Sequence, residues 1–282
     1  MFRKILIANR GEIAVRIIRA ARELGIATVA VYSTADKEAL HTLLADEAIC
    51  IGPGKATESY LNINAILSAA VLTEAEAIHP GFGFLSENSK FATMCEEVGI
   101  KFIGPSARVM DVMGDKINAC AQMIKANVPV IPGSDGEVHT AEEALAIAEK
   151  IGYPVMLKAS AGGGGKGIRK VEKADDLVSA FETASSEAKA NFGNGAMYLE
   201  RVIYPARHIE VQILADQMGH VIHLGERDCS LQRNNQKVLE ESPSIAIGKT
   251  LRNEIGAAAV RAAESVGYEN AGTIEFLLDE AT

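Results

Sequence analysis

A run of glycines between two apolar segments is the first sign of chemistry in this 282-residue chain. Residues 155–157 are apolar, Lys158 follows them, and residues 162–165 are four consecutive glycines. Glycine buries almost nothing and loses the most entropy on ordering, so such a run favours close approach of a ligand to the backbone. Consecutive N–H groups can surround an anion such as phosphate, and Lys158 could place its charge beside it. A flexible linker is the alternative, although linkers are usually Ser/Gly mixtures between polar segments.

This loop matches neither of the two common nucleotide-binding fingerprints. A Walker loop requires Lys-Ser/Thr at the start of a helix, and no such pair follows the glycines. A dinucleotide fingerprint also leads into a helix, whereas residues 168–171 predict another short strand. We therefore expect the loop to join two strands of a hairpin and to fold over a nucleotide as a flap.

Three further segments carry charged residues where chemistry could occur. Lys116 opens a predicted helix, where a cation opposes the helix dipole; a bound anion would account for it, and a surface position is the alternative. Residues 198–203 are apolar around a charged pair, so their backbone could bind an adenine edge with Glu200 facing its amino group. Residues 226–237 are dense in donors and acceptors and predict a ligand-binding loop, with Lys237 at the edge of the apolar run that follows.

Glu275 is the single residue for which the sequence suggests the most specific role. It lies within the predicted strand 272–278, which we expect to be buried on at least one face. A buried carboxylate needs a partner or a metal, and Mg²⁺ is the natural partner beside a phosphate-binding loop. A simple salt bridge is the alternative, and a second acidic ligand is expected nearby. In the predicted strand 207–216, the face that carries His208, Glu210 and Gln212 is interpreted as solvated, with the floor of a cleft as the alternative.

The elements that must position these residues change in kind along the chain. Up to residue 105, strands and helices alternate, which implies a parallel sheet covered on both faces. The expected strands are 4–8, 26–32, 48–51, 77–78 and 101–103, and the expected helices are 12–24, 39–46, 63–72 and 88–98. The later region is α+β and rich in antiparallel pairing, with helices expected at 115–127, from 140, at 174–190 and at 251–266, and strands around the glycine loop and at 197–201, 207–216, 221–224 and 272–278.

Composition narrows the class of protein. The net charge is −9, which argues against a nucleic-acid partner. The four cysteines are isolated in sequence, as in a reduced cytosolic protein. No signal peptide or membrane-length apolar run is found, so we expect a cytoplasmic protein without a membrane partner. Because the chain ends just after the strand 272–278, where a returning strand is expected, we interpret it as a fragment.

Assembled, these residues resemble biotin carboxylase, the ATP-grasp component of acetyl-CoA carboxylase and related biotin-dependent enzymes. The resemblance runs the whole length of the chain as its N-terminal part. It rests on the glycine loop and on five motifs, IANRGEIA at 7–14, HPGFGFLSEN at 79–88, MGDK at 113–116, ERDCS at 226–230 and GTIEF at 272–276. It implies a Rossmann-like N-terminal domain at 1–114 and an incomplete ATP-grasp domain at 115–282, with a lid at about 131–203.

The resemblance also implies an activity and the residues for it. Such ligases use Mg-ATP (or Mn-ATP) to activate bicarbonate as carboxyphosphate and then carboxylate biotin on a carrier protein. This is the first half-reaction of acetyl-CoA carboxylase, an enzyme of fatty acid biosynthesis. Lys116 and Lys158 would bind phosphates beneath a lid that contains Gly164 and Gly165. The remaining assignments are adenine contacts from Glu200, Arg201 and Ile203, further nucleotide contacts from His208, Gln232 and Asn235, a bicarbonate contact from Lys237 and metal binding by Glu275.

Partners and departures follow from the same resemblance. The implied partners are the biotin carboxyl carrier protein, carboxyltransferase subunits and, at full length, a second copy of the enzyme. Many relatives have histidine where this chain has Asn235; an amide can still hydrogen-bond a ribose hydroxyl, so we expect retained nucleotide binding with less pH dependence. The family's second metal carboxylate, its arginine for biotin carboxylation and its general-base glutamate would follow Thr282. We therefore expect the chain alone to bind nucleotide weakly and not to turn over.

Two rival functions remain open on the sequence. One is another ATP-grasp ligase of carbamoyl-phosphate-synthetase type, which would use an amine in place of biotin. The other is a catalytically silent nucleotide-binding module. Stimulation of ATP cleavage by biotin, stimulation by ammonia, or tight ATP binding without hydrolysis would distinguish the three.

Overall fold

The computed structural model describes residues 1–114, 116–160, 168–233 and 236–280. The chain divides into two compact units. The first comprises Met1–Asp115, Gln212–Leu224 and Ala262–Thr273, and the second comprises Lys116–Val211, Gly225–Arg261 and Ile274–Thr282. Within the described ranges, no helix is both long and apolar enough to cross a bilayer.

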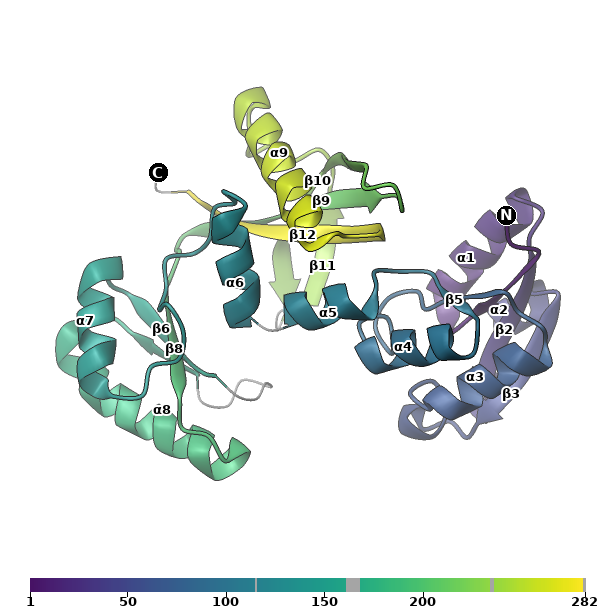
Figure 1. Ribbon diagram of the computed structural model, residues 1–282, viewed down its shortest axis with the longest axis horizontal. Helices are drawn as coiled ribbons and strands as arrows, with labels where there is room; N and C mark the ends of the chain where they lie inside the picture. The colour runs from purple at the N-terminus through teal and green to yellow at the C-terminus, as the bar shows by residue number, and fades with distance from the viewer. Residues whose placement is uncertain (115, 161–167, 234–235, 281–282) are drawn as a thin grey trace. The chain divides into compact units, whose positions relative to one another are not determined.

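A parallel five-stranded sheet with the order β3-β2-β1-β4-β5 forms the centre of the N-terminal region (Figure 1). Its strands are β1 (Lys4–Ile7), β2 (Ala27–Ser33), β3 (Glu47–Gly52), β4 (Ala77–His79) and β5 (Lys101–Phe102). The connecting elements are α1 (Gly11–Glu23), η1 (Thr34–Asp36), α2 (Leu40–Leu44), η2 (Ala56–Glu58), α3 (Ile63–Leu72) and α4 (Ser89–Glu97). Parallel neighbours need crossover connections, and the predicted alternation of strand and helix supplies them. The expected Rossmann-like sheet is therefore confirmed.

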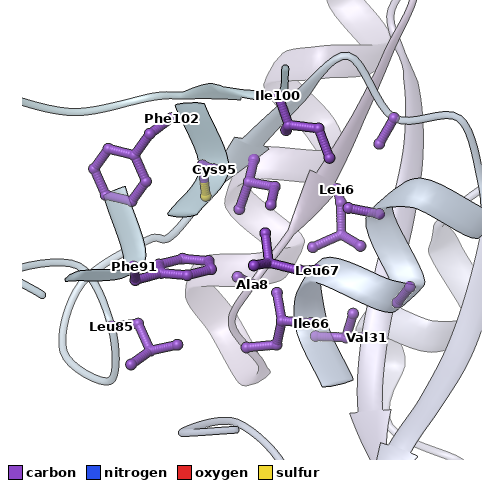
Figure 2. Close-up of a cluster of buried hydrophobic side chains, with 14 of the residues drawn as sticks. Leu6, Ala8, Val31, Ile66, Leu67, Leu85, Phe91, Cys95, Ile100 and Phe102 are labelled. Carbon is purple, nitrogen blue, oxygen red and sulfur yellow. The ribbon is translucent and has the colours of Figure 1, made fainter. Parts of the chain in front are cut away.

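Strand β1 shows how this sheet is covered on both faces. Leu6 joins a buried cluster with residues of α3 and α4, whereas Ile7 packs with Ile18 of α1 on the other side. Successive side chains of a strand point to opposite faces, so a strand buried on both sides is apolar throughout. Figure 2 shows the first cluster, in which the rings of Phe91 and Phe102 meet edge to face with their centroids 5.8 Å apart.

A smaller antiparallel sheet, ordered β7-β6-β8, flanks the glycine loop. Strand β6 (Val155–Ala159) pairs with both β7 (Ile168–Val171) and β8 (Met197–Arg201), which confirms the antiparallel pairing predicted across the loop. One face of this sheet, which carries Val155 and Leu157, packs against α7 (Ala141–Ile151) and α8 (Leu177–Phe192), the latter preceded by η3 (Ala174–Asp176). The opposite face therefore presents the alternate residues of β6, including Lys158.

The start of α7 follows the predicted capping pattern. The Thr140 hydroxyl accepts a hydrogen bond from the Glu143 N–H at 3.2 Å, and the Glu143 carboxylate accepts one from the Thr140 N–H at 3.3 Å. Two backbone donors that the helix leaves unpaired are involved in this exchange. The capping box thus fixes where α7 begins within the predicted lid.

A four-stranded sheet in the order β11-β10-β9-β12 carries most of the remaining candidate residues. Its strands are β9 (Ala206–Ala215), β10 (Val221–Arg233), β11 (Gln236–Glu241) and β12 (Asn270–Asp279), and the other helices are α5 (Ala107–Gly114), α6 (Lys116–Lys125) and α9 (Lys249–Val266). Helix α5 is not predicted by the sequence patterns, which show a change of character after Pro105. The other helices agree with the expected ones to within a few residues at each end.

Two expectations about this sheet are wrong. The described part of the segment 226–237 forms strands rather than the expected loop: β10 continues to Arg233 and pairs with β11, and Glu226 and Asp228 are each only 4% exposed. The face of β9 that was expected to be solvated buries Glu210, which is 5% exposed. In both cases a run of polar residues predicts solvent contact, but the side chains pair with opposite charges and can therefore be buried.

Candidate functional site

Lys158 and Glu200 form an ion pair on the open face of the β7-β6-β8 sheet. In the pairing of β6 with β8, Lys158 lies opposite Tyr198 and Met156 lies opposite Glu200, so the ion pair is diagonal across the strands. Both side chains are partly exposed. The structure thus brings together a predicted phosphate contact and a predicted adenine contact on one sheet face.

Arg201 and Ile203 follow Glu200 at the end of β8. The Arg201 N–H donates to the Pro132 carbonyl at 2.7 Å, and the Val202 N–H donates to the Pro154 carbonyl at 2.8 Å. These bonds fix the path of the chain as it leaves the sheet, with Ile203 half-buried beyond it. Since the Arg201 N–H is already used, an adenine contact from Arg201 would have to come from its carbonyl group.

Lys237 is the centre of a second charged group, on the β11-β10-β9-β12 sheet. Its amine donates to the carboxylates of Glu210 and Glu275, and Glu210 is also paired with Arg227. Arg227 additionally lies 3.4 Å from a carboxylate oxygen of Glu240. Two cations and three carboxylates therefore alternate across the strands. Glu210 was missed as a site residue on the sequence, where the polar face of β9 was interpreted as solvated.

The exposure of Glu275 differs from the prediction. Its side chain is 61% exposed, so the expected burial is wrong, although the expected partner is present as Lys237. Strand β12 alternates between exposed and half-buried positions, and Glu275 falls on the exposed set. Among the described residues, this accessible carboxylate pairs with a lysine that it shares with Glu210, so it can change partners, which suits a residue expected to bind a ligand-borne metal.

The pKa values around Lys237 favour charged forms. Burial opposes ionisation of Glu210, but hydrogen bonds from Lys237 and Arg227 outweigh it and hold the pKa of this carboxyl below its usual value. Burial also opposes the charge of Lys237, and its two carboxylate partners outweigh that effect and raise the pKa of the amine. Lys237 therefore stays cationic at physiological pH, which suits contact with an anion rather than proton abstraction.

His208 and Gln232 lie close to this group. His208 lines one pocket together with Glu210, Lys237 and Glu275. Its backbone N–H donates to the Ser230 hydroxyl at 3.1 Å, which fixes β9 against β10 at this level. The Gln232 amide donates to the Cys229 carbonyl at 3.0 Å. The structure thus places His208, Lys237 and Glu275 together as predicted residues of one site.

Four predicted residues cannot be placed in this way. Gly164, Gly165 and Asn235 lie outside the described residues. Lys116 begins helix α6, as expected from the sequence, but its side chain is likewise outside the description. Their assignments stay predictions.

Within the described residues, one other group has the spacing of a metal site. Ligand atoms of Glu210, Cys229 and Glu240 lie within 4.8 Å of one another. Burial, together with these two glutamates, raises the pKa of the Cys229 thiol to about 11, so the thiol is protonated at neutral pH. Glu210 is already paired with Lys237 and Arg227. The chemistry of this group does not fit a divalent metal, whereas the exposed Glu275 carboxylate is a hard oxygen ligand of the kind that Mg²⁺ prefers.

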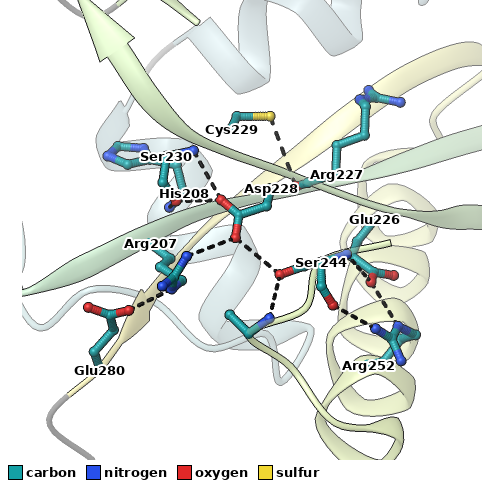
Figure 3. A network of polar contacts seen from close by, with 11 residues as sticks. Arg207, His208, Glu226, Arg227, Asp228, Cys229, Ser230, Ser244, Arg252 and Glu280 are labelled. Atoms are coloured by element: carbon teal, nitrogen blue, oxygen red, sulfur yellow. Dashed lines mark hydrogen bonds and ion pairs between the residues drawn. The ribbon is translucent and has the colours of Figure 1, made fainter. Parts of the chain in front are cut away.

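A third polar group joins β9, β10, the turn after β11 and α9, and none of its residues is among the assigned site residues. Asp228 accepts hydrogen bonds from Ser230 and Ser244 and pairs with Arg207, while Glu226 pairs with Arg252 (Figure 3). We call these six residues the buried network. The signal for it in the sequence is the alternation of acidic residues at 226 and 228, which is that of a strand rather than a loop.

Comparison with known proteins gives matches over both the N-terminal region and the region from residue 115 onward. A family model described as the biotin carboxylase N-terminal domain matches residues 1–110, and one described as the carbamoyl-phosphate synthase L chain ATP-binding domain matches residues 115–282. Among curated relatives, biotin carboxylase of Nostoc sp. is 58% identical and biotin carboxylase 1 of Bacillus subtilis is 56% identical, each over 99% of this chain. The chain spans 63% and 62% of their respective lengths.

Solved structures resemble the chain to a similar extent. A complex of biotin carboxylase from Campylobacter jejuni, described as a beta-gamma-ATP complex, has 53% identity and a TM-score of 0.90, covering all of this chain and 63% of that one. The biotin carboxylase domain dimer of Hydrogenobacter thermophilus 2-oxoglutarate carboxylase, solved with MgADP, ADP and bicarbonate, has 52% identity and a TM-score of 0.87, covering all of this chain and 62% of that one.

Proposed function

The chain belongs to the biotin carboxylase family, and we propose that it serves in ATP-dependent activation of bicarbonate to carboxyphosphate and carboxylation of biotin on a carrier protein. The observation that carries this proposal is that two lysine side chains, Lys158 and Lys237, each pair with carboxylates and lie on two different sheets. Each lysine is held by acidic side chains that are partly exposed or shared, so an anionic ligand can take their place.

Phosphoryl transfer needs positioned reactants and neutralised charge more than covalent help from the protein. Lys158, with Lys116 at the start of α6, would contact the nucleotide phosphates, and Glu200, Arg201 and Ile203 would border the adenine. Gly164 and Gly165 would close over the phosphates and exclude water from the reactive acyl phosphate. His208, Gln232 and Asn235 complete the proposed nucleotide site.

Lys237 would hold bicarbonate through its charge. Its raised pKa keeps the ammonium form, so the group attracts the anion and does not act as the base. Glu275 would provide a carboxylate oxygen to Mg²⁺, which would supply neutralisation of the phosphate charge. Glu210 would stay with Arg227 and keep Lys237 oriented when Glu275 turns to the metal.

We also propose a wider setting for this reaction. We place the protein in the cytoplasm as part of acetyl-CoA carboxylase in fatty acid biosynthesis, with a biotin carboxyl carrier protein and carboxyltransferase subunits as partners and a homodimer as its assembly. The solved dimer of the Hydrogenobacter domain supports the last point by similarity.

Thermal unfolding with and without Mg-ATP tests the nucleotide site. A ligand at about one hundred times its dissociation constant adds about 2.7 kcal/mol to the native state. We expect a shift that is lost in Lys158→Ala and kept in Lys189→Ala, which removes an exposed lysine from α8. An equal shift in Lys158→Ala would contradict the phosphate assignment.

The family model for residues 115–282 favours one second candidate, a ligase of carbamoyl-phosphate-synthetase type. Both reactions begin with bicarbonate and ATP and differ in the acceptor. In the whole protein we expect bicarbonate-dependent ADP formation to be stimulated by free biotin and not by ammonia. Stimulation by ammonia alone would replace the proposal with the second candidate.

A further inference from the structure

A pocket of about 600 Å³ lies in the second unit, beside the segment 198–203, whose Tyr198 lines it. It is bordered by α6, by the connector 130–136, by the end of α7 and by Tyr198 of β8. Its volume is within the range of about 300–1,000 Å³ that is typical of small-molecule sites. The walls are mainly apolar, with Ile124, Val130, Ile131, Pro132 and Ile151 among them.

The connector side of this pocket is held by backbone bonds. Ser134 donates its N–H to the Leu199 carbonyl at 2.8 Å, and its hydroxyl accepts from the Leu199 N–H at 3.1 Å. A Cβ atom at Gly133 would lie 2.7 Å from the Leu199 carbonyl oxygen and 2.8 Å from the Tyr198 hydroxyl oxygen, so only glycine permits this close approach. The connector therefore acts as a fixed wall beside β8, and the space next to it is preformed.

The pocket is lined by more basic than acidic side chains. Lys125 and Lys150 line it and are exposed, and neither forms an ion pair within the described part of the chain. Asp135, which is also exposed, is the acidic residue among the lining residues. The Tyr198 hydroxyl adds a polar group, and burial with nearby Cys120 and Glu200 raises its pKa to about 12, so it stays protonated. An apolar space with two unpaired cations and a hydroxyl suits a ligand that is apolar along its body and anionic at one end.

We propose that this pocket is a second binding site, for an amphipathic monoanion such as a medium-chain carboxylate, with its chain among the apolar walls and its head group at Lys125 and Lys150. The pocket adjoins the proposed nucleotide site through Pro132 and Gly133, which contact Arg201 and Glu200, but none of the residues assigned to the nucleotide or to bicarbonate lines it. Its occupation can therefore be measured without ATP.

Cys120 offers a local reporter because it lines the pocket and is partly exposed, whereas Cys95 and Cys229 are buried. In a Cys50→Ser background, which removes the exposed thiol, the rate of Cys120 alkylation by iodoacetamide is followed by mass spectrometry. We expect decanoate, kept below its aggregation threshold, to slow alkylation at least fivefold. Decanol, which has the chain without the charge, should slow it less than twofold.

Two variants make the result specific. Lys125→Gln combined with Lys150→Gln should abolish protection by decanoate, and both residues are exposed, so the fold should be retained. Ala121→Phe, on the exposed side of α6, should fill the pocket and slow alkylation without any ligand. No protection by millimolar decanoate, equal protection by decanol, or full protection in the double variant would each overturn the proposal. Because no readout depends on ATP, these outcomes leave the proposed function untouched.

Discussion

Two groups of ion pairs on the β11-β10-β9-β12 sheet differ in how completely their charges are enclosed. In the buried network, Glu226 and Asp228 are each 4% exposed. In the group around Lys237, the Glu275 side chain is 61% exposed and shares its lysine with Glu210. Similar residue types in neighbouring positions therefore have two different roles. Enclosed pairs fix strands against each other, while an open, shared pair can exchange one partner for a ligand.

The hydrogen bonds to individual carboxylate oxygens in the buried network show how its charges are held. One carboxylate oxygen of Asp228 accepts from the Ser230 N–H at 3.1 Å, and the other accepts from the Ser244 hydroxyl at 3.1 Å and from Arg207 at 3.4 Å. An oxygen of Glu226 accepts from the Ser244 N–H at 3.1 Å and from Arg252 at 2.7 Å. Acceptors with several fixed protein donors have no reason to change partners.

The largest expected effect is the loss of an enclosed carboxylate. Asp228→Ala leaves Arg207 without this partner and leaves two serine hydroxyl groups to find other acceptors. Arg207 is 37% exposed and keeps Glu280 as a partner, so the main cost is that of buried donors left without an acceptor, about 1–3 kcal/mol. We expect the free energy of unfolding, measured by urea titration with circular dichroism, to fall by about this amount.

Asp175→Ala is the matched control, since this aspartate is exposed in the turn before α8. Its effect should stay within about 0.5 kcal/mol. If the two variants were equally stable, the buried network would not hold the sheet and the comparison would fail.

Acidic pH is expected to lower the free energy of unfolding by a smaller amount. Burial opposes ionisation of both Glu226 and Asp228. Hydrogen bonds outweigh this effect and lower both pKa values; they come from Arg252 and Ser244 for Glu226 and from Ser230 and Ser244 for Asp228. A lowered folded-state pKa gives stability that is complete above the usual carboxyl value, 4.5 for Glu226 and 3.8 for Asp228, and is lost as the pH falls through the lowered value. We therefore expect the free energy of unfolding to fall between pH 5 and pH 3.

Urea midpoints over this pH range would measure the effect. Glu226→Gln removes one of the titrating groups, so its stability should depend less steeply on pH than that of the parent protein. An unchanged pH slope in Glu226→Gln would show that this carboxylate does not contribute to the acid sensitivity.

The same contrast explains which parts of the structure the sequence could predict. Local patterns were sufficient for α1, for the capping box of Thr140 and Glu143 and for the strands beside the glycine loop, because period and capping are set by neighbours in the chain. They failed for β10, where burial of Glu226 and Asp228 depends on Arg252 and Ser244, which are distant in sequence. They failed for Glu210 for the same reason, because its cations lie on other strands.

Glu275 shows the opposite error: the residue was singled out correctly as a charged strand position, but for burial that it does not have. Its partner Lys237 lies on β11. The direction of a side chain on a strand at the side of a sheet depends on what covers that sheet. Periodicity alone cannot give this, since both faces of an alternating strand have the same spacing.

The smallest expected change in stability belongs to Glu275→Gln, and it is the most informative about function. A partly exposed ion pair contributes about 0–1 kcal/mol, and Lys237 keeps Glu210 as its partner, so the free energy of unfolding should change by less than about 1 kcal/mol. The thermal stabilisation by Mg-ATP should nevertheless decrease, while that by ATP with a chelator should not, because the carboxylate is proposed to act on the metal. Glu240→Gln is the control, since it removes another exposed carboxylate that contacts Arg227 and should leave both ligand effects intact. A large loss of stability in Glu275→Gln without ligand, or an unchanged response to Mg-ATP, would show that the open group is a structural pair like its enclosed neighbour.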